Sequence, residues 1–216
     1  MTGKLFSPGK LLLTAEYAVL DGALALAVPT RSGQEFFFDE MAGGNSRVIW
    51  EAFHEDRPWL KVEIDYAKWQ ISKSNLQEPA AFVLKVLKTV HQLSTTKFRD
   101  TTDYHLRTNL QFPPDFGLGS SSTLMNNLAE WSGIDAFELN DKCLGGSGYD
   151  VAIAKAKTPI LFKIEHEQRH FEKIDFNPDF KDELIFVHLN QKQNSREGIN
   201  LYKSLKKPEN LFEELS

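Results

Sequence analysis

The sequence has little of several features that mark common classes of protein. Its 216 residues include one cysteine, Cys143, so an internal disulfide is excluded and a reducing compartment is expected. Its most apolar stretch, residues 11–28, contains Glu16 and Asp21 and is too polar to span a bilayer. The formal net charge of -5 disfavours a nucleic acid or an anionic membrane as partner. Because no signal peptide is evident either, we predict a cytoplasmic protein.

Several familiar site motifs are also missing. Gly3 and Gly9 are one residue too far apart for a P-loop, and no serine or threonine follows Lys10. The pair Gly117 and Gly119 lacks the third glycine of a dinucleotide-binding fingerprint. No Gly-x-Ser-x-Gly elbow occurs, which disfavours a serine hydrolase. The function must therefore be sought in other patterns.

The order of the expected elements predicts a mixed α+β fold. Short segments rich in aromatic and β-branched residues, bounded by turn formers, are expected to be strands, namely 11–14, 34–39, 47–53, 59–65, 103–112, 159–164, 170–174 and 183–190. Apolar residues at helical spacing predict one helix that begins at Pro79. They predict four others over 120–131, 137–144, 150–157 and 195–205.

The most informative segment is the glycine- and serine-rich loop at residues 114–122. Gly117 and Gly119 allow a tight turn and a close approach to a ligand. The three serines that follow offer hydroxyls and backbone N–H groups at the positive end of a helix. This combination favours a bound phosphate, with a hydroxyl left for a metal ion. The alternative is a loop that only begins a helix.

Two further segments accompany this loop. The first, residues 7–22, begins Ser-Pro-Gly-Lys, and the second, residues 145–152, begins Gly-Gly-Ser-Gly-Tyr-Asp. In order and spacing, the three segments resemble the GHMP kinases, which include galactokinase, homoserine kinase and mevalonate kinase, and the first is most similar to mevalonate kinase. The resemblance implies a GHMP kinase-like two-domain α+β fold. Its parts would be an ATP-binding, ribosomal protein S5 domain 2-like N-terminal domain over 1–181, and an incomplete C-terminal α/β domain over 182–216.

The resemblance implies ATP and Mg²⁺ as cofactors. Ser121 would be the magnesium ligand, with Ser120 as the alternative. The position where mevalonate kinases carry a second, glutamate ligand is Leu139 here, so the neighbouring Glu138 is a weaker candidate. The expected nucleotide-binding residues share the loop, and they are Pro114, Gly117, Leu118, Gly119, Ser120, Ser121 and Ser122.

Asp150 and Lys10 are the expected catalytic residues. By resemblance, Asp150 faces the substrate hydroxyl as general base or orienting group. Lys10 would stabilise phosphate charge or hold Asp150 ionised. The alternatives are an acid that only favours a helix N-terminus at Asp150, and a solvated lysine at Lys10.

Glu16, Tyr17 and Gly148 are the expected substrate-binding residues. An isolated carboxylate in an apolar stretch is costly, so Glu16 should have a partner. Tyr17 stands where mevalonate kinases carry a histidine, which leaves the substrate open. A small acidic metabolite is expected, mevalonate first and phosphomevalonate next, with Lys10 and Arg196 as available cations.

The third glycine-rich motif of the family is missing. After residue 205 only a short acidic tail remains. One expectation is therefore an active kinase, and the other is an inactive GHMP-like module that binds nucleotide or assembles with a partner. An incomplete second domain would expose apolar surface, so self-association is also expected.

Overall fold

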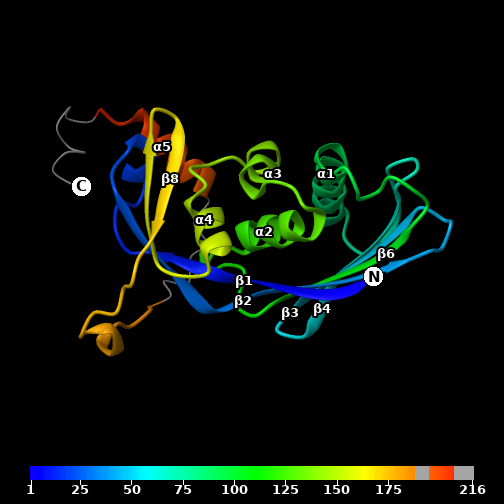
Figure 1. Ribbon diagram of the computed structural model, residues 1–216, viewed down its shortest axis with the longest axis horizontal. Helices are drawn as coiled ribbons and strands as arrows, with labels where there is room; N and C mark the ends of the chain where they lie inside the picture. Colours follow the sequence, from blue (N-terminus) through cyan, green and yellow to red (C-terminus); the bar gives the residue numbers. More distant parts are fainter. Residues whose placement is uncertain (188–194, 207–216) are drawn as a thin grey trace.

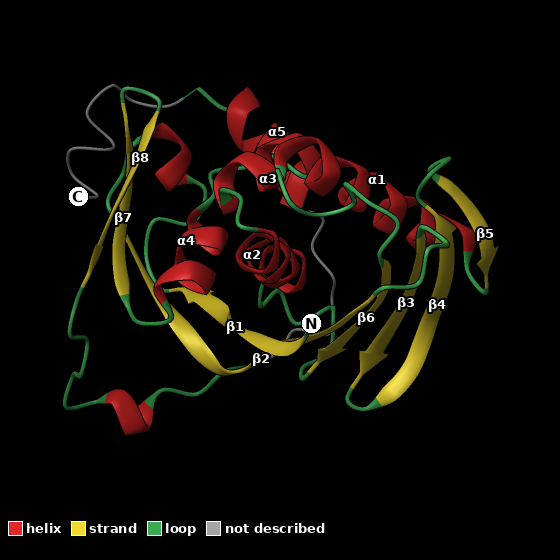
Figure 2. Cartoon of the chain, turned by 45° about the vertical axis from the view of Figure 1, so that its right-hand side comes forward, coloured by secondary structure: helices red, strands yellow, loops and turns green. Residues whose placement is uncertain are grey.

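The computed structural model describes residues 1–187 and 195–206, and these form one curved sheet with helices along one face (Figure 2). The strand order is β5-β4-β3-β6-β2-β7-β8, with β1 beside β2. Among the strands of the described residues, only β3 and β6 pair in parallel. The strands are β1 (Thr2–Leu12), β2 (Ala25–Met41), β3 (Arg47–His54), β4 (Arg57–Asp65), β5 (Gln70–Ser74), β6 (Asp103–Leu110), β7 (Ile160–Glu165) and β8 (Gln168–Lys173).

The helices lie over the concave face of the sheet, with α1, α2 and α3 side by side and α4 next to the β7–β8 hairpin (Figure 1). The α-helices are α1 (Gln77–Leu93), α2 (Ser120–Ser132), α3 (Ala136–Cys143), α4 (Tyr149–Ala156) and α5 (Ser195–Ser204). Two short 3₁₀ turns are η1 (Ala18–Asp21) and η2 (Lys181–Glu183). This arrangement confirms the predicted α+β class.

The apolar faces of helices and strands meet in two main clusters. The larger cluster joins β2, β3, β4 and β6 to α1, α2 and α3, and it includes the fully buried Phe36, Leu106 and Leu128. The second cluster joins β2 and β7 to α4 through Ile153 and Phe162. Helix α4 is thereby fixed against the sheet, and this fixes the start of the helix, where Asp150 lies.

Strand β2 is the longest, and β1 pairs along most of it. Its N-terminal end pairs with β7, and its C-terminal part pairs with β6. The register between β1 and β2 shifts between Pro8 and Lys10. This irregularity lies next to the glycine- and serine-rich loop.

Two sequence predictions of strands need correction. The first strand begins at Thr2, not at residue 11, and the Pro8-Gly9 pair lies at an irregularity inside this strand. The segment predicted as a strand at 183–190 begins in η2, and its described residues 184–187 form no strand. A short apolar run, such as residues 184–187, does not make a strand without a pairing partner. The remainder of that prediction lies outside the described residues.

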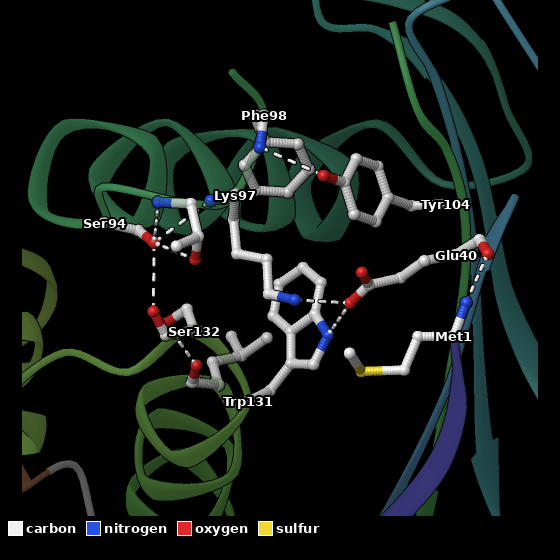
Figure 3. A network of polar contacts seen from close by, with 10 residues as sticks. Met1, Glu40, Ser94, Lys97, Phe98, Tyr104, Trp131 and Ser132 are labelled. Atoms are coloured by element: carbon white, nitrogen blue, oxygen red, sulfur yellow. Dashed lines mark hydrogen bonds and ion pairs between the residues drawn. The ribbon is translucent and has the colours of Figure 1, made fainter. Parts of the chain in front are cut away.

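A buried polar cluster joins the far end of the sheet to the ends of α1 and α2 (Figure 3). The Lys97 ammonium donates to Glu40 Oε1 at 2.5 Å, and the Trp131 indole donates to the same oxygen at 2.8 Å. The Lys97 amine also lies 4.9 Å from the centre of the Trp131 ring. The cluster therefore joins three segments by charge as well as by apolar packing.

Several apolar side chains near the end of the described chain are exposed. Ile185 is 85% exposed and Val187 is 68% exposed, while Phe186 lies against Phe116 of the glycine- and serine-rich loop, with ring centres 5.9 Å apart. Self-association through this surface stays a prediction, which gel filtration tests. No helix among the described residues is long and apolar enough to cross a membrane.

Candidate active site

Strand β1 and the glycine- and serine-rich loop meet at Lys10. The Lys10 N–H donates to the Leu118 carbonyl at 3.0 Å. Gly9 makes this contact possible, because a Cβ there would lie 2.6 Å from Thr30 Oγ1 and 3.0 Å from the Leu118 carbonyl oxygen. The glycine is thus required by close packing between a strand and a loop far apart in sequence.

Gly9→Ala is expected to displace this loop. Overpacking of a close contact costs about 1–3 kcal/mol of folding free energy, and a displaced loop should also weaken nucleotide binding. Urea unfolding and nucleotide titration measure the two effects. Gly44→Ala is the control, since Gly44 lies in the connection between β2 and β3, has a φ of +75°, and would place a Cβ with no atom within 4 Å. Equal nucleotide affinity in Gly9→Ala and wild type would contradict the expectation.

The loop itself is a tight turn that apolar side chains anchor to the protein. Leu118 packs with Leu110 and Phe112 in a small buried cluster. Gly117 and Gly119 have φ values of +73° and +78°, in the region that favours glycine. Gly119 precedes α2, which has no side-chain cap at its N-terminus. The first N–H groups of α2 therefore have no partner within the helix and are suited to an anion.

The Lys10 side chain joins this loop to the start of α4. A Cβ at Gly119 would lie 3.1 Å from Lys10 Cγ, so the lysine stem runs along the loop. Its Nζ lies 3.2 Å from Asp150 Oδ1 and donates to the Tyr149 hydroxyl at 2.5 Å. The Lys10 side chain is 15% exposed and that of Asp150 is 33% exposed. The structure thus brings the three predicted segments together around one ammonium group.

Two further ionisable groups border this pair. Burial raises the pKa of Glu16, the Lys10 charge opposes the rise, and the Asp150 carboxylate adds to it. Burial raises the pKa of Tyr149 strongly, and the negative charges of Asp150 and Glu16 raise it further. Tyr149 therefore stays protonated at neutral pH, and its oxygen can accept a hydrogen bond from Lys10. Glu16 is predicted to need a partner, and the positive charge of Lys10 acts as one.

Tyr149→Phe is expected to lower the rate of any reaction that uses Lys10 by about tenfold. A hydrogen bond to a charged group is worth about 1.5–3 kcal/mol. Without the Tyr149 hydroxyl, the Lys10 ammonium keeps, among the described residues, only its ion pair with Asp150. Steady-state kinetics measures the effect, with Tyr104→Phe as the control, since that hydroxyl accepts from Phe98 N–H in the distant core. A rate equal to wild type would show that Tyr149 does not hold Lys10.

Comparison with known proteins identifies the fold. No family model and no curated protein matches the sequence. Among solved structures, mevalonate kinase from Methanococcus jannaschii superposes with a TM-score of 0.67 at 14% identity, over 100% of this chain and 70% of that chain. A second mevalonate kinase gives 0.66 at 14% identity, over 99% and 70%. The chain has the fold of the GHMP kinases. A D-glycero-D-manno-heptose 1-phosphate kinase from Bacteriodes thetaiotaomicron also matches, with a TM-score of 0.58 at 17% identity, over 82% and 61%.

Within this GHMP kinase fold, the predicted magnesium ligands lie in unlike surroundings. Ser121 is exposed in the first turn of α2, next to the loop, whereas Ser120 is partly covered and its carbonyl accepts from Thr123 Oγ1 at 2.8 Å. Leu139, at the position expected for a glutamate, is fully buried in the main core. Glu138 is exposed and lies 3.8 Å from Lys142. Among the described residues no group of three or more histidine, cysteine or acidic side chains could hold a metal.

The remaining predicted substrate residues lie at or near the start of three different helices, η1, α4 and α5. Tyr17 follows β1 and stacks on Tyr202 of α5, with ring centres 5.8 Å apart. Gly148 is buried, with a φ of +88°, directly before α4. Arg196 lies in the first turn of α5, and its side chain is outside the described set.

Sequence reasoning missed several polar residues of the site region. Ser7 of β1 donates to Asn127 Oδ1 at 2.8 Å and accepts from Asn126 Nδ2 at 2.9 Å. Asn126 also reaches the Ala154 carbonyl, at 3.3 Å, so this buried network ties β1 to α2 and α4. Two adjacent asparagines inside an amphipathic helix were the available signal, because buried amides need partners.

Proposed function

We propose that this protein is an ATP-dependent kinase that transfers the γ-phosphoryl group to a hydroxyl of a small molecule. One observation carries the proposal. The Lys10 amine lies 3.2 Å from the Asp150 carboxylate, and its stem runs along the loop at Gly119. Phosphoryl transfer is mostly positioning and charge neutralisation, and it needs a cation between phosphate donors and an acid that faces the acceptor.

In this proposal each group has a distinct task. The loop N–H groups at the start of α2 bind nucleotide phosphate oxygens. Lys10 stabilises negative charge that develops on the transferred group. Asp150 orients the acceptor hydroxyl and takes its proton. Tyr149, which stays protonated, holds the Lys10 ammonium in place.

Magnesium would be held mainly by the nucleotide. A magnesium ion often binds one or two protein oxygens and completes its shell with phosphate oxygens and water. The exposed Ser121 hydroxyl beside the loop fits this role, while Glu138 is the second and weaker candidate. When bound, the ion neutralises charge on the phosphate oxygens.

The proposed substrate is a small acidic alcohol, with mevalonate first and phosphomevalonate second. Mevalonate is placed first because residues 7–22 are most similar to mevalonate kinases. The solved structures support only the kinase class, since mevalonate kinases give TM-scores from 0.67 to 0.50 and sugar kinases give 0.60 to 0.53. The presence of Tyr17 in place of a histidine leaves room for a related acid.

A substrate panel tests the proposal. The purified chain is incubated with ATP and Mg²⁺ together with mevalonate, phosphomevalonate, homoserine or galactose, and ADP release and product mass are followed. Phosphorylated mevalonate is the expected product. The second candidate, a module that binds nucleotide without transfer, is favoured by the share of the mevalonate kinase chains that is matched, 70%. Saturable ATP binding with no product from any acceptor would support the module and overturn the kinase.

A further inference from the structure

Arg169 joins the turn before Asp150 to two other elements. It lies on β8, opposite Ile164 of β7. Its Nε donates to the Ser147 carbonyl at 2.7 Å, and one terminal nitrogen lies 3.4 Å from the Gly146 carbonyl. The two terminal nitrogens, Nη1 and Nη2, donate to the Asp141 carboxylate of α3 at 2.8 and 2.7 Å.

The turn that Arg169 contacts is rich in glycines at positive φ. Gly145, Gly146 and Gly148 have φ values of +80°, +95° and +88°. Glycine at such angles loses more conformational freedom on folding than other residues, so this turn needs outside contacts to keep one conformation. The Asn140 side chain supplies one of them, by donating to the Gly145 carbonyl at 3.0 Å. The two contacts of Arg169 lie closer to Asp150 along the chain.

The fit at Gly148 shows how closely the guanidinium approaches. A Cβ at this position would lie 2.7 Å from Arg169 Nε. Gly148 is the residue before α4, and Asp150 is in the first turn of that helix. The guanidinium also lies over the Phe137 ring, at 5.3 Å from its centre. Arg169 is thus held by a carboxylate and a ring on α3 while it holds two carbonyls of the turn.

We propose that Arg169 is a positioning residue, which fixes the Gly145–Gly148 turn and thereby sets the position of Asp150 for transfer. This inference rests on the proposed kinase function. An arginine suits the task because its planar fork donates several hydrogen bonds in fixed directions, which a lysine cannot reproduce. A misplacement of a reacting group by ~1 Å can cost about 100-fold in rate.

Kinetics and hydrogen exchange of three variants test the proposal. Arg169→Ala is expected to lower kcat by about 10- to 100-fold while KM for ATP changes little, and to speed amide exchange over residues 145–151. Arg169→Lys should recover only a small part of kcat. Asp141→Asn weakens the pairing of Arg169 with α3, while the guanidinium keeps its contacts with the turn. A smaller loss of kcat is therefore expected, and folding is less at risk.

Lys155→Ala is the matched control, since Lys155 also lies over the Phe137 ring, at 5.6 Å, and pairs with Asp135 rather than with the turn. Its kcat should equal that of wild type. Arg169→Ala with wild-type kcat and a lower unfolding free energy would overturn the proposal and leave a structural role alone. A wild-type chain without transferase activity would overturn the kinase function instead. In that case, amide exchange still tests whether Arg169 fixes the turn. Unchanged exchange over residues 145–151 in Arg169→Ala would show that it does not, and faster exchange would show that it does.

Discussion

Asp150→Asn is expected to lower kcat by about 100- to 10,000-fold, the range that general acid–base groups contribute. Asparagine keeps the size of the side chain and its place in the first turn of α4, but it cannot take a proton from an acceptor hydroxyl. It also removes the negative charge that lies 3.2 Å from the Lys10 ammonium. Both losses act on the transferred group and its acceptor, whereas the glycine- and serine-rich loop is not changed.

Nucleotide binding separates this effect from misfolding. Asp150→Asn should bind ATP with an affinity close to that of wild type and unfold at a similar urea concentration. Asp115→Asn is the matched control, because Asp115 is an exposed carboxylate of the glycine- and serine-rich loop to which the proposal gives no role. Retention of more than about a tenth of wild-type kcat in Asp150→Asn would show that the carboxylate is not the general base.

The parts of the site that the sequence predicts well are those with local physical causes. Positive φ values at Gly117 and Gly119 and the start of α2 follow from a glycine pair before an apolar helical stripe. The approach of Lys10 to Asp150 was predicted through the resemblance, and the structure gives the distance of 3.2 Å. Their roles in catalysis stay predictions until the substrate panel is measured.

What the sequence did not predict depends on contacts between distant segments. Arg169 lies 22 residues after Ser147 and meets it because the β7–β8 hairpin folds back beside α4. Tyr149 was passed over because a tyrosine beside the expected catalytic acid has no local pattern that indicates its contact with Lys10. Strand β5 was missed because its five residues are mostly exposed and polar, and β4 pairing decides its conformation.

The ion pair of Lys97 and Glu40 is another contact that no sequence pattern indicates (Figure 3). It is expected to affect the stability of the fold rather than the candidate active site. The two side chains are only 10% and 15% exposed. Charges removed from water are costly unless they are paired and hydrogen-bonded. Here Glu40 Oε1 accepts from both Lys97 and the Trp131 indole, so removal of either ion leaves the other charge buried without its partner.

Lys97→Met and Glu40→Gln are each expected to lower the unfolding free energy by about 3–5 kcal/mol, the usual result of breaking a buried pair from one side. The double variant Lys97→Met with Glu40→Gln should lose less than the sum, because no unpaired ion remains. Lys142→Met serves as a control, since its pair with Glu138 is about half exposed on both sides and should contribute no more than about 1 kcal/mol. Urea unfolding of the four variants measures these differences. Additive losses in the double variant would show that the Lys97 and Glu40 ions do not interact.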